Sequence, residues 1–484
     1  MVIEISAYRL LAPLFGNSAF TWTALIGVIL IAFSAGGYLG GWLAEKKSDF
    51  ALLGWLLAGA SVLTLFVPAI NAGVAPGFEK SGLISGPLMV SLILFALPGI
   101  MLGAVSPASV RLYSLLGHDA HVGFAAGTIS MLGSLGSFVG TLLTGFYLLP
   151  TFGVKSIFIG AGLVLLLLAV IAFFTAKNTV TMQLPIWLAG AVAAAVGMSA
   201  SERALANLVY QHDSFYHRVQ VLEQGQGPWL QRFLHLDSTL EGGMKMSDGS
   251  TVLDYQEFWQ LPAMKPGFNV KRALFIGAGA FAMPEQLSKQ NPEAIIDVIE
   301  IDPHVIEVGR RFFKLDEFPN VHAHAGDARR FLKQHEGEKY DFIFGDAYNG
   351  IRQIPVHLAS KEFFELVRER LAPGGMFLMN VISAAEGPRA ELLAGMMTTV
   401  QSAFSAVDLF AVMGGGPHIQ NVLVLAGDES WSKAFSDTTY VHGSAQHKIA
   451  RSYLPPNRWP LNGVVFTDDH NPVDAIIARG LLAE

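Results

Sequence analysis

The chain has 484 residues, of which 52% are hydrophobic and only 15% are charged, and its mean hydropathy is +0.43. So apolar a composition is unusual for a protein that is soluble throughout, and it indicates a membrane segment. The net charge of −7 excludes an extended basic surface, so we expect no nucleic acid partner. With no cysteine, the chain forms no disulfide, no thiolate zinc site and no cysteine nucleophile.

The charged residues divide the chain into two parts. Residues 1–200 hold only 12 of the 71 charged side chains, and the remaining 284 residues hold 59. A helix that crosses the bilayer needs about 20 apolar residues. We expect such spans at 20–43, 51–70, 83–102, 122–149 and 157–175, and a less apolar one at 184–200. The first part is therefore predicted to be a helical transmembrane domain.

Two further features of the first part concern its helices. Residues 1–15 are apolar but carry Glu4 and Arg9, so we expect an interfacial segment or a shortened first span that ends at Pro13. Glycines recur four residues apart, and such pairs allow helix backbones to approach closely in lipid. These pairs are Gly36 with Gly40, Gly37 with Gly41, and Gly136 with Gly140.

From Arg272 onwards, short apolar runs alternate with helical stretches, which is typical of a parallel α/β sheet. A strand at 273–276 leads into the glycine turn 277–279, and a second strand at 295–301 contains Glu300 near its end. Such glycines let a nucleotide approach the backbone closely, and a carboxylate at the end of the next strand accepts hydrogen bonds from the ribose hydroxyls.

Two more acidic residues follow in the same pattern. Asp327 comes after Gly326, and Asp346 follows a predicted strand at 340–345; a turn at 371–375 leads into a further strand at 376–381. The carboxyl ends of parallel strands face one crevice, where ligands bind in open α/β sheets. The sequence thus predicts a nucleotide-binding α/β domain with its acids in one cleft.

Several short motifs carry a resemblance to a known family. S-F-Y-H at 214–217 is similar to S-x-Y-Q, L-D-S-T-L-E at 236–241 to L-D-G-x-x-Q, and Y-Q-E at 255–257 to Y-H-E. Together with the glycine turn and the three acids, they resemble the spermidine synthase family. R-L-L-A-P at 9–13 and T-D-D at 467–469 are similar to segments of its membrane-fused bacterial members, the spermidine synthase-like polyamine aminopropyltransferases.

The resemblance implies a multi-pass α-helical membrane domain at 1–200, a small N-terminal β domain at 201–265, and a class I methyltransferase-like, Rossmann-type α/β domain at 266–484. The residues expected at its site fall into three groups, with no metal among them. They are Asp346 and Tyr216 for catalysis; Gly277, Ala278, Gly279, Glu300, Ile301, Asp327 and Ala328 for the cofactor; and Glu241, Gln256, Tyr348 and Asn349 for the substrate.

The implied reaction is the attack of an amine on the carbon beside the sulfonium of decarboxylated S-adenosylmethionine, which releases methylthioadenosine. An ammonium group is no nucleophile, so a carboxylate such as Asp346 must accept or direct its proton.

Two family acids are replaced here, by Ala280 in the glycine turn and by Asn349 in the catalytic loop. Loss of a carboxylate leaves a buried ammonium unpaired and makes room for the carboxylate of intact S-adenosylmethionine. Besides aminopropyl transfer, two alternatives therefore stay open. One is an enzyme that uses intact S-adenosylmethionine, by methyl transfer or by cleavage to methylthioadenosine; the other is a sensor that only binds a nucleotide.

The expected partners are the lipid bilayer, a small amine or other small acceptor, and further copies of the chain in a homo-oligomer. We expect a multi-pass protein of the inner, cytoplasmic membrane. Lys46, Lys47, Arg111 and Lys177 fall on one side, which the positive-inside rule makes cytoplasmic. A crossing at 184–200 would put the catalytic domain outside, although its cofactor is made in the cytosol. Either that segment does not cross, or the enzyme works on an exported supply.

Overall fold

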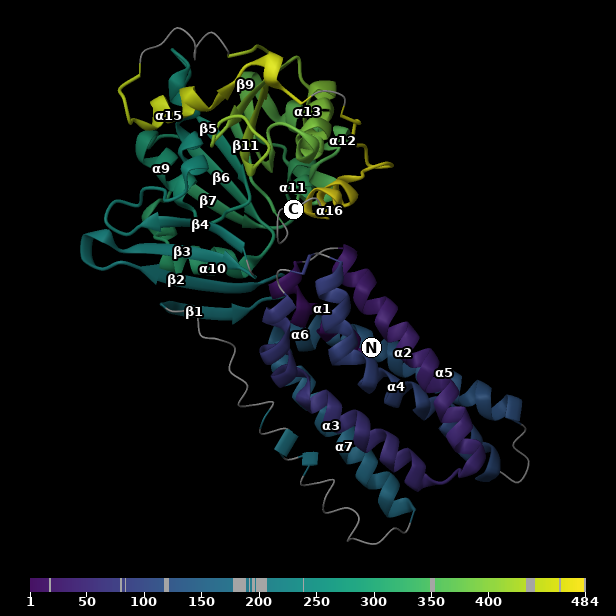
Figure 1. The fold of residues 1–484 in the computed structure, drawn as a ribbon. Coiled ribbons are helices and arrows are strands. Elements are labelled where there is room, and N and C mark those ends of the chain that lie inside the picture. The colour runs from purple at the N-terminus through teal and green to yellow at the C-terminus, as the bar shows by residue number, and fades with distance from the viewer. Residues whose placement is uncertain are drawn as a thin grey trace. The chain divides into compact units, whose positions relative to one another are not determined.

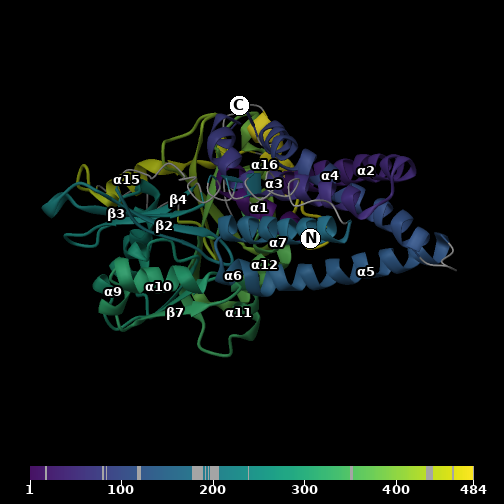
Figure 2. The same cartoon turned by 90° about the horizontal axis from the view of Figure 1, so that it is seen from below.

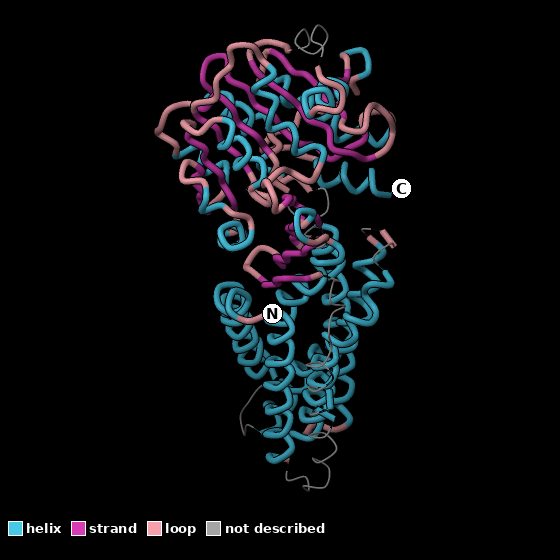
Figure 3. The backbone as a smooth tube through the Cα atoms, turned by 90° about the vertical axis from the view of Figure 1, so that its left-hand side faces the viewer, coloured by secondary structure: helices cyan, strands magenta, loops and turns pink. Residues whose placement is uncertain are grey.

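The computed structural model describes residues 1–16, 19–78, 81–82, 84–116, 122–176, 189–190, 192–193, 196, 207–237, 239–348, 353–431, 440–460 and 463–482. The chain divides into two compact units, Met1–Ala204 and Leu205–Glu484. The described part of the first unit is entirely helical, whereas the second combines strands and helices (Figure 3).

The first unit consists of long apolar helices (Figure 1). In chain order its elements are α1 (Val2–Phe15), α2 (Ala19–Lys46), α3 (Phe50–Val74), η1 (Ala75–Phe78), α4 (Ser85–Leu116), α5 (Val122–Leu143), η2 (Thr144–Leu148), α6 (Leu149–Thr151) and α7 (Val154–Thr175). Five stretches among the described residues are long and apolar enough to cross a membrane. They are Phe20–Lys46, Phe50–Phe78, Ser85–Leu116, Val122–Leu148 and Val154–Thr175. The sixth expected span, at 184–200, lies largely outside the described residues.

Two helices extend further than expected. Helix α1 does not end at Pro13 but continues to Phe15, whose side chain is buried. Helix α4 does not end near Leu102 but runs to Leu116, with Pro98 and Pro107 inside it. A proline removes one backbone donor and does not have to end a helix that neighbouring helices support. With 14 residues, α1 is too short to cross a bilayer.

Close packing of α2 on α4 depends on one of the expected glycine pairs. A Cβ atom at Gly36 would lie 2.2 Å from the carbonyl oxygen of Ile100, and one at Gly40 would lie 2.3 Å from that of Ala104. Any larger residue would force the two backbones apart. Gly37 and Gly41, in contrast, have no atom within 4 Å of such a Cβ.

The second unit begins with a four-stranded antiparallel sheet in the order β1-β2-β3-β4 (Figure 1), of which Figure 2 labels β2, β3 and β4. Its strands are β1 (Leu208–Asp213), β2 (Arg218–Gln224), β3 (Gln231–Leu236) and β4 (Thr239–Lys245), with the short 3₁₀ helix η4 (Gly227–Trp229) between β2 and β3. The longer 3₁₀ helix η5 (Asp254–Met264) connects this sheet to the larger one. Val219, Val221 and Leu234 bury one face of the small sheet in the same core as the larger sheet.

The larger sheet has eight strands in the order β12-β10-β11-β9-β8-β5-β6-β7. These strands are β5 (Arg272–Ile276), β6 (Ile295–Glu300), β7 (Val321–Ala325), β8 (Tyr340–Gly345), β9 (Leu371–Ala384), β10 (Ala406–Ala411), β11 (Ile419–Gly427) and β12 (Tyr453–Leu454). Strands β5 to β9 pair in parallel, and β11 is antiparallel to both β9 and β10. This arrangement is the predicted methyltransferase-like α/β fold, which is thereby confirmed.

Helices cover both faces of the larger sheet (Figure 1). On one face lie α9 (Ala282–Gln290), α10 (Pro303–Phe312) and α15 (Ala445–Ser452); on the other lie α11 (Ala328–Gln334), α12 (Lys361–Arg370), α13 (Glu391–Ala403) and α16 (Val473–Leu482). Short 3₁₀ helices occur between these elements, namely η6 (Leu315–Glu317), η7 (Val356–Leu358), η8 (Pro388–Ala390) and η9 (Pro456–Arg458).

The expected strands at 273–276 and 340–345 match β5 and β8 within one residue. The expected strand at 376–381 lies within β9, which begins at Leu371. Its register with β8 shifts between Tyr340 and Phe342, so that residues 371–375 form an irregular start of the strand. Gly277, Glu300, Asp327 and Asp346 lie at or just after the carboxyl ends of four parallel strands, which brings them to one edge of the sheet.

Candidate active site

The glycine turn lies directly against the segment that carries Asp346. Gly277 has φ +93°, and a Cβ atom there would lie 2.3 Å from the carbonyl oxygen of Asp346. The backbone N–H of Asp346 donates to the carbonyl of Ile276 at 2.8 Å, and that of Gly277 donates to Ile299 at 2.9 Å. Only glycine fits this position, because another residue would be strained and would collide with the Asp346 backbone.

Glu300, at the end of β6, has its carboxylate beneath this turn. One oxygen, Oε2, accepts a hydrogen bond of 3.1 Å from the N–H of Ala278, and Oε1 accepts one of 3.0 Å from the N–H of Asp302. Burial raises the pKa of Glu300 above its ordinary value, and these two N–H groups partly oppose the rise. The next residue, Ile301, is 37% exposed. The carboxylate is thus held rigidly at the position where the ribose was expected.

Asp327 follows β7 and caps α11. Its Oδ1 accepts a hydrogen bond of 2.8 Å from the N–H of Arg330, and its Oδ2 lies 2.7 Å from Nε2 of His357. Ala328, the first residue of the helix, is buried. Asp327, expected to bind the cofactor, therefore already has a side-chain partner that the sequence had not indicated.

Asp346 lies at the centre of a side-chain hydrogen-bond network. The hydroxyl of Tyr255 donates to Oδ2 at 2.9 Å, and Nδ2 of Asn380 donates to Oδ1 at 2.8 Å. Asn421 in turn donates to Oδ1 of Asn380 at 3.1 Å. Burial raises the pKa of Asp346 to about 6, against the two hydrogen bonds, which lower it. A carboxylate with such a pKa is ionised at neutral pH and accepts a proton more readily than an ordinary aspartate.

Asp346 faces a cavity of about 520 Å³. The cavity is lined by Thr239, Leu240, Glu241, Leu253, Asp254, Tyr255, Asp346, Tyr348, Asn380, Ile382, Val412, Met413 and Asn421. No lysine or arginine is among these residues. Tyr348 is fixed in the wall, because its hydroxyl donates to the carbonyl of Asn380 and accepts from the N–H of Ile382, both at 2.9 Å. The described lining thus carries three acids and no basic side chain.

Glu241 brings a second carboxylate to this cavity. Thr239 Oγ1 donates a hydrogen bond of 2.5 Å to its Oε1. Burial raises the pKa of Glu241 to about 7; the hydrogen bond from Thr239 opposes the rise, and the charge of Asp346 adds to it. Gln256, expected beside it, is only 2% exposed and does not line the cavity as described. It packs behind β4, with Nε2 2.9 Å from where a Cβ of Gly242 would lie.

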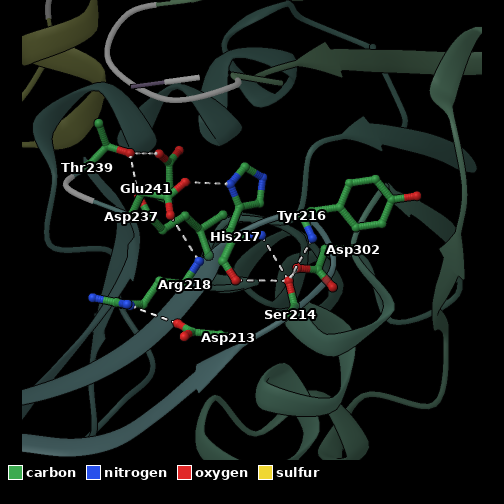
Figure 4. Close-up of polar contacts among 10 residues, drawn as sticks. Asp213, Ser214, Tyr216, His217, Arg218, Asp237, Thr239, Glu241 and Asp302 are labelled. Atoms are coloured by element: carbon green, nitrogen blue, oxygen red, sulfur yellow. Dashed lines mark hydrogen bonds and ion pairs between the residues drawn. The ribbon is translucent and has the colours of Figure 1, made fainter. Parts of the chain in front are cut away.

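Tyr216, expected to be catalytic, belongs to a separate cluster in the turn between β1 and β2 (Figure 4). Its N–H donates to Oγ of Ser214 at 3.1 Å, and Ser214 hydrogen-bonds Asp302. The neighbouring His217 pairs with Asp237 at 3.1 Å. The Tyr216 ring points away from Glu241 in this view, and the tyrosine is not among the residues that line the cavity with Asp346. Asn349 lies outside the described residues.

Several residues of the site were not predicted from the sequence, namely Tyr255, Asn380, Asn421 and His357. For two of them a signal existed. Asn380 and Asn421 are polar residues within otherwise apolar buried strands, and a buried amide needs hydrogen-bond partners. Tyr255 was noticed only as part of a motif, and nothing in the sequence links His357 to Asp327.

The chain is similar in sequence to known proteins. The family model described as "Spermine/spermidine synthase domain" matches residues 255–413. The polyamine aminopropyltransferase of Vibrio vulnificus is 38% identical over 123 residues, which cover 25% of this chain and 41% of that protein. The polyamine aminopropyltransferase of Mycobacterium tuberculosis is 26% identical over 453 residues, 85% of this chain and 80% of that protein.

A solved structure, a probable spermidine synthase from Corynebacterium glutamicum, aligns with a TM-score of 0.42 and 16% identity, over 51% of this chain and 86% of the other. The chain spans less than half the length of the Vibrio protein. The residues that this family model matches include Tyr255, Gly277, Glu300, Asp327, Asp346 and Asn380.

Proposed function

We propose that the second unit, with its spermine/spermidine synthase domain, is an aminopropyltransferase that uses decarboxylated S-adenosylmethionine and a small amine. The amine nitrogen forms a bond to the carbon beside the sulfonium as the carbon–sulfur bond breaks. The electron pair of that bond stays on sulfur, so the second product is neutral methylthioadenosine. The names of the similar proteins, polyamine aminopropyltransferases, support this choice of chemistry.

The observation that carries the proposal is the environment of Asp346. A carboxylate in a cavity without a described basic neighbour attracts a cationic amine, and its pKa of about 6 suits it to take the proton that the attacking ammonium must lose. The hydrogen bonds from Tyr255 and Asn380 hold it in one orientation, as a proton acceptor beside a reacting amine requires. The sulfonium is already a cationic leaving group and needs no acid.

In this proposal the nucleotide binds along the edge formed by the carboxyl ends of β5 to β8. The glycine turn 277–279 accommodates it, Glu300 binds the ribose hydroxyls, and Asp327 with Ala328 contacts the adenine. Tyr348 contacts the acceptor amine, and Glu241 lines the same cavity. The backbone N–H of Tyr216 donates to Ser214, and Tyr216 is not among the residues that line the cavity, so we assign it no step of the reaction.

One observation favours a second function. Ala280 of the glycine turn is buried at 1% exposure and carries no charge, so the turn itself offers nothing to repel a carboxylate. Intact S-adenosylmethionine has such a carboxylate. Chemistry on the intact molecule, by methyl transfer or by cleavage to methylthioadenosine, is therefore the second candidate.

Mass spectrometry of the released nucleoside separates these functions. Detergent-purified full-length protein is given decarboxylated S-adenosylmethionine with putrescine in one tube and intact S-adenosylmethionine in another. Methylthioadenosine in the first tube alone supports aminopropyl transfer. Methylthioadenosine or S-adenosylhomocysteine in the second tube moves the assignment to the intact molecule, and no nucleoside in either contradicts both.

We further propose that the five long apolar helices cross a membrane and that the second unit faces the cytosol, where the donor is made. Because the chain has no cysteine, a single introduced thiol reports its side of the membrane. Ser247 is exposed in the second unit, so we choose the variant Ser247→Cys. Labelling by a membrane-impermeant maleimide only after cell lysis supports the cytosolic side, and labelling of intact cells contradicts it.

A further inference from the structure

We propose that Glu241 binds the ammonium group of the donor's three-carbon tail and thereby selects decarboxylated over intact S-adenosylmethionine. The inference rests on the proposed aminopropyl transfer. Glu241 stands where the family motif has a glutamine, and it would determine which donor is used. Ala280, which replaces a family acid, leaves both decarboxylated and intact S-adenosylmethionine possible as donors.

Strand β4 lies against the glycine turn, which puts Glu241 on the donor side of the cavity. A Cβ atom at Gly279 would lie 3.0 Å from the carbonyl oxygen of Glu241, and one at Gly242 would lie 3.0 Å from the backbone nitrogen of Ala280. A tail that extends from the glycine turn towards Asp346 therefore passes the Glu241 side chain, which lines the same cavity.

The carboxylate of Glu241 is only partly satisfied within the protein. Thr239 donates to Oε1, and no described residue hydrogen-bonds Oε2. Two half-buried carboxylates, Glu241 and Asp346, share a cavity whose described lining has no basic side chain. Such a pair is unfavourable unless a ligand supplies positive charge. The proposed substrates supply two ammonium groups, one on the acceptor for Asp346 and one on the donor tail for Glu241.

The same charges disfavour the intact donor. Its tail carries a carboxylate beside the ammonium, and this carboxylate would come close to Glu241 and Asp346 in a cavity whose described lining has no basic side chain. Like charges in a partly desolvated cavity repel each other strongly. Although Ala280 is uncharged, the cavity keeps a negative charge, because Glu241 on the neighbouring strand β4 supplies a carboxylate.

Several other charged groups face Glu241 and set its titration. Asp346 after β8 and Glu300 at the end of β6 raise its pKa, and His217 in the turn before β2 lowers it. His217 is paired with Asp237, and Asp302 lies beside it. The net result is a pKa of about 7, so Glu241 gains its charge, and with it the proposed affinity for an ammonium, as the pH rises through neutrality.

The test is calorimetric titration of full-length protein in detergent with two ligands, decarboxylated S-adenosylmethionine and methylthioadenosine. Both contain the adenosine part, but only the first has the sulfonium and the ammonium tail, so the ratio of their affinities isolates these two positive charges. The thioether analogue of the donor, which carries the ammonium tail on a neutral sulfur, should lose affinity in Glu241→Gln to the same extent, which assigns the loss to the ammonium. Glu241→Gln keeps the size of the side chain and an oxygen for the Thr239 hydrogen bond. Glu223→Gln is the matched control, because Glu223 lies in the same small sheet and pairs with Arg232 away from the cavity.

At pH 8 we expect Glu241→Gln to lose about 10- to 100-fold in affinity for decarboxylated S-adenosylmethionine, as for the loss of one charged hydrogen bond, with methylthioadenosine unchanged. In the unchanged protein the affinity ratio should rise from pH 6 to pH 8, and in Glu241→Gln it should stay flat. Turnover of intact S-adenosylmethionine relative to the decarboxylated donor should increase in the variant.

An unchanged affinity ratio in Glu241→Gln, or an equal loss in Glu223→Gln, would overturn the role of Glu241 while the aminopropyl transfer stands. If the unchanged protein binds neither ligand, both the role of Glu241 and the proposed function fail. The two failures are therefore distinguishable in one experiment.

Discussion

The hydroxyl of Tyr255 donates a 2.9 Å hydrogen bond to Oδ2 of Asp346, across 91 positions of sequence. The contact links η5, which follows the small β-sheet, to the end of β8 in the larger sheet. It stabilises the ionised carboxylate and keeps the pKa of Asp346 from rising further than its burial already dictates.

Tyr255→Phe should therefore shift the pH dependence of turnover. Loss of a hydrogen bond to a charged group costs about 1.5–3 kcal/mol, so the pKa of Asp346 should rise by about one to two units. A proton acceptor works only when ionised, so the acid limb of the kcat profile should move to higher pH by the same amount. The control is Tyr210→Phe, because the hydroxyl of Tyr210 contacts His304 and not Asp346. If the acid limb of the kcat profile does not move in Tyr255→Phe, a group other than Asp346 sets the pH dependence of turnover.

Glu300→Ala should weaken nucleotide binding. The substitution removes the carboxylate that is expected to accept the ribose hydroxyls and leaves the N–H groups of Ala278 and Asp302 without their acceptor. We expect the Kd for methylthioadenosine to rise about 100-fold or more, measured by calorimetry. Glu307→Gln, at an exposed position of α10, should bind as before. Unchanged affinity in Glu300→Ala would mean that the ribose lies elsewhere.

Gly277→Ala should abolish turnover, because the added Cβ atom both strains the backbone and collides with the Asp346 backbone. Gly267 provides the matched comparison, because it also has positive φ, at +74°, but has no atom within 4 Å of an added Cβ. Gly267→Ala should cost about 1–2 kcal/mol of stability and keep its turnover. Gly277→Ala should in addition displace the Asp346 backbone and lose about 100-fold or more in kcat. Equal turnover in the two variants, with thermal unfolding measured alongside, would contradict this close approach.

The buried Glu285 should make the free energy of unfolding depend on pH, independently of the active site. Its side chain is fully buried on α9, neither carboxylate oxygen has a partner among the described residues, and burial raises its pKa from 4.5 to about 9. The folded state therefore keeps a proton that the unfolded state releases above pH 4.5. Stability should fall by up to about 1.4 kcal/mol per pH unit as the pH rises through this window, and the loss should level off near the folded pKa.

Glu285→Gln removes that titration. The variant should gain in Tm over the unchanged protein, and the gain should grow from pH 5 to pH 8 in differential scanning fluorimetry of the full-length protein. Glu317→Gln, at an exposed position near Glu285, should have no such trend. Parallel Tm curves for Glu285→Gln and the unchanged protein would show that Glu285 is already ionised in the folded state.

Much of the fold follows from local patterns. The apolar runs at 20–43 and 51–70 and the strands at 273–276 and 340–345 were predictable, because length and periodicity set them. The ends of α1 and α4 were not, since Pro13 and Pro107 lie inside helices that packing supports. A proline indicates a weakened backbone, but only the surrounding helices decide whether the helix stops.

The residues of the candidate site, too, were only partly predictable from the sequence. Gly277, Glu300 and Asp346 were indicated by their positions after strands, because parallel strands bring their carboxyl ends to one edge. The partners of Asp346 depend on contacts between distant elements, and no local pattern encodes the pairing with Tyr255. The same holds for His357 at Asp327, which depends on how η7 packs beside α11.

Aminopropyl transfer can be observed by following the aminopropyl group itself. Decarboxylated S-adenosylmethionine labelled with ¹³C in its three-carbon tail is incubated with putrescine and full-length protein, and the products are analysed by mass spectrometry. We expect the label to appear in an amine that is one aminopropyl group larger than putrescine. Asp346→Asn should lower the rate by about 10²- to 10⁴-fold while methylthioadenosine still binds. Label that stays in the nucleotide or in a free three-carbon product, or an Asp346→Asn variant that transfers at the normal rate, would contradict the proposed reaction.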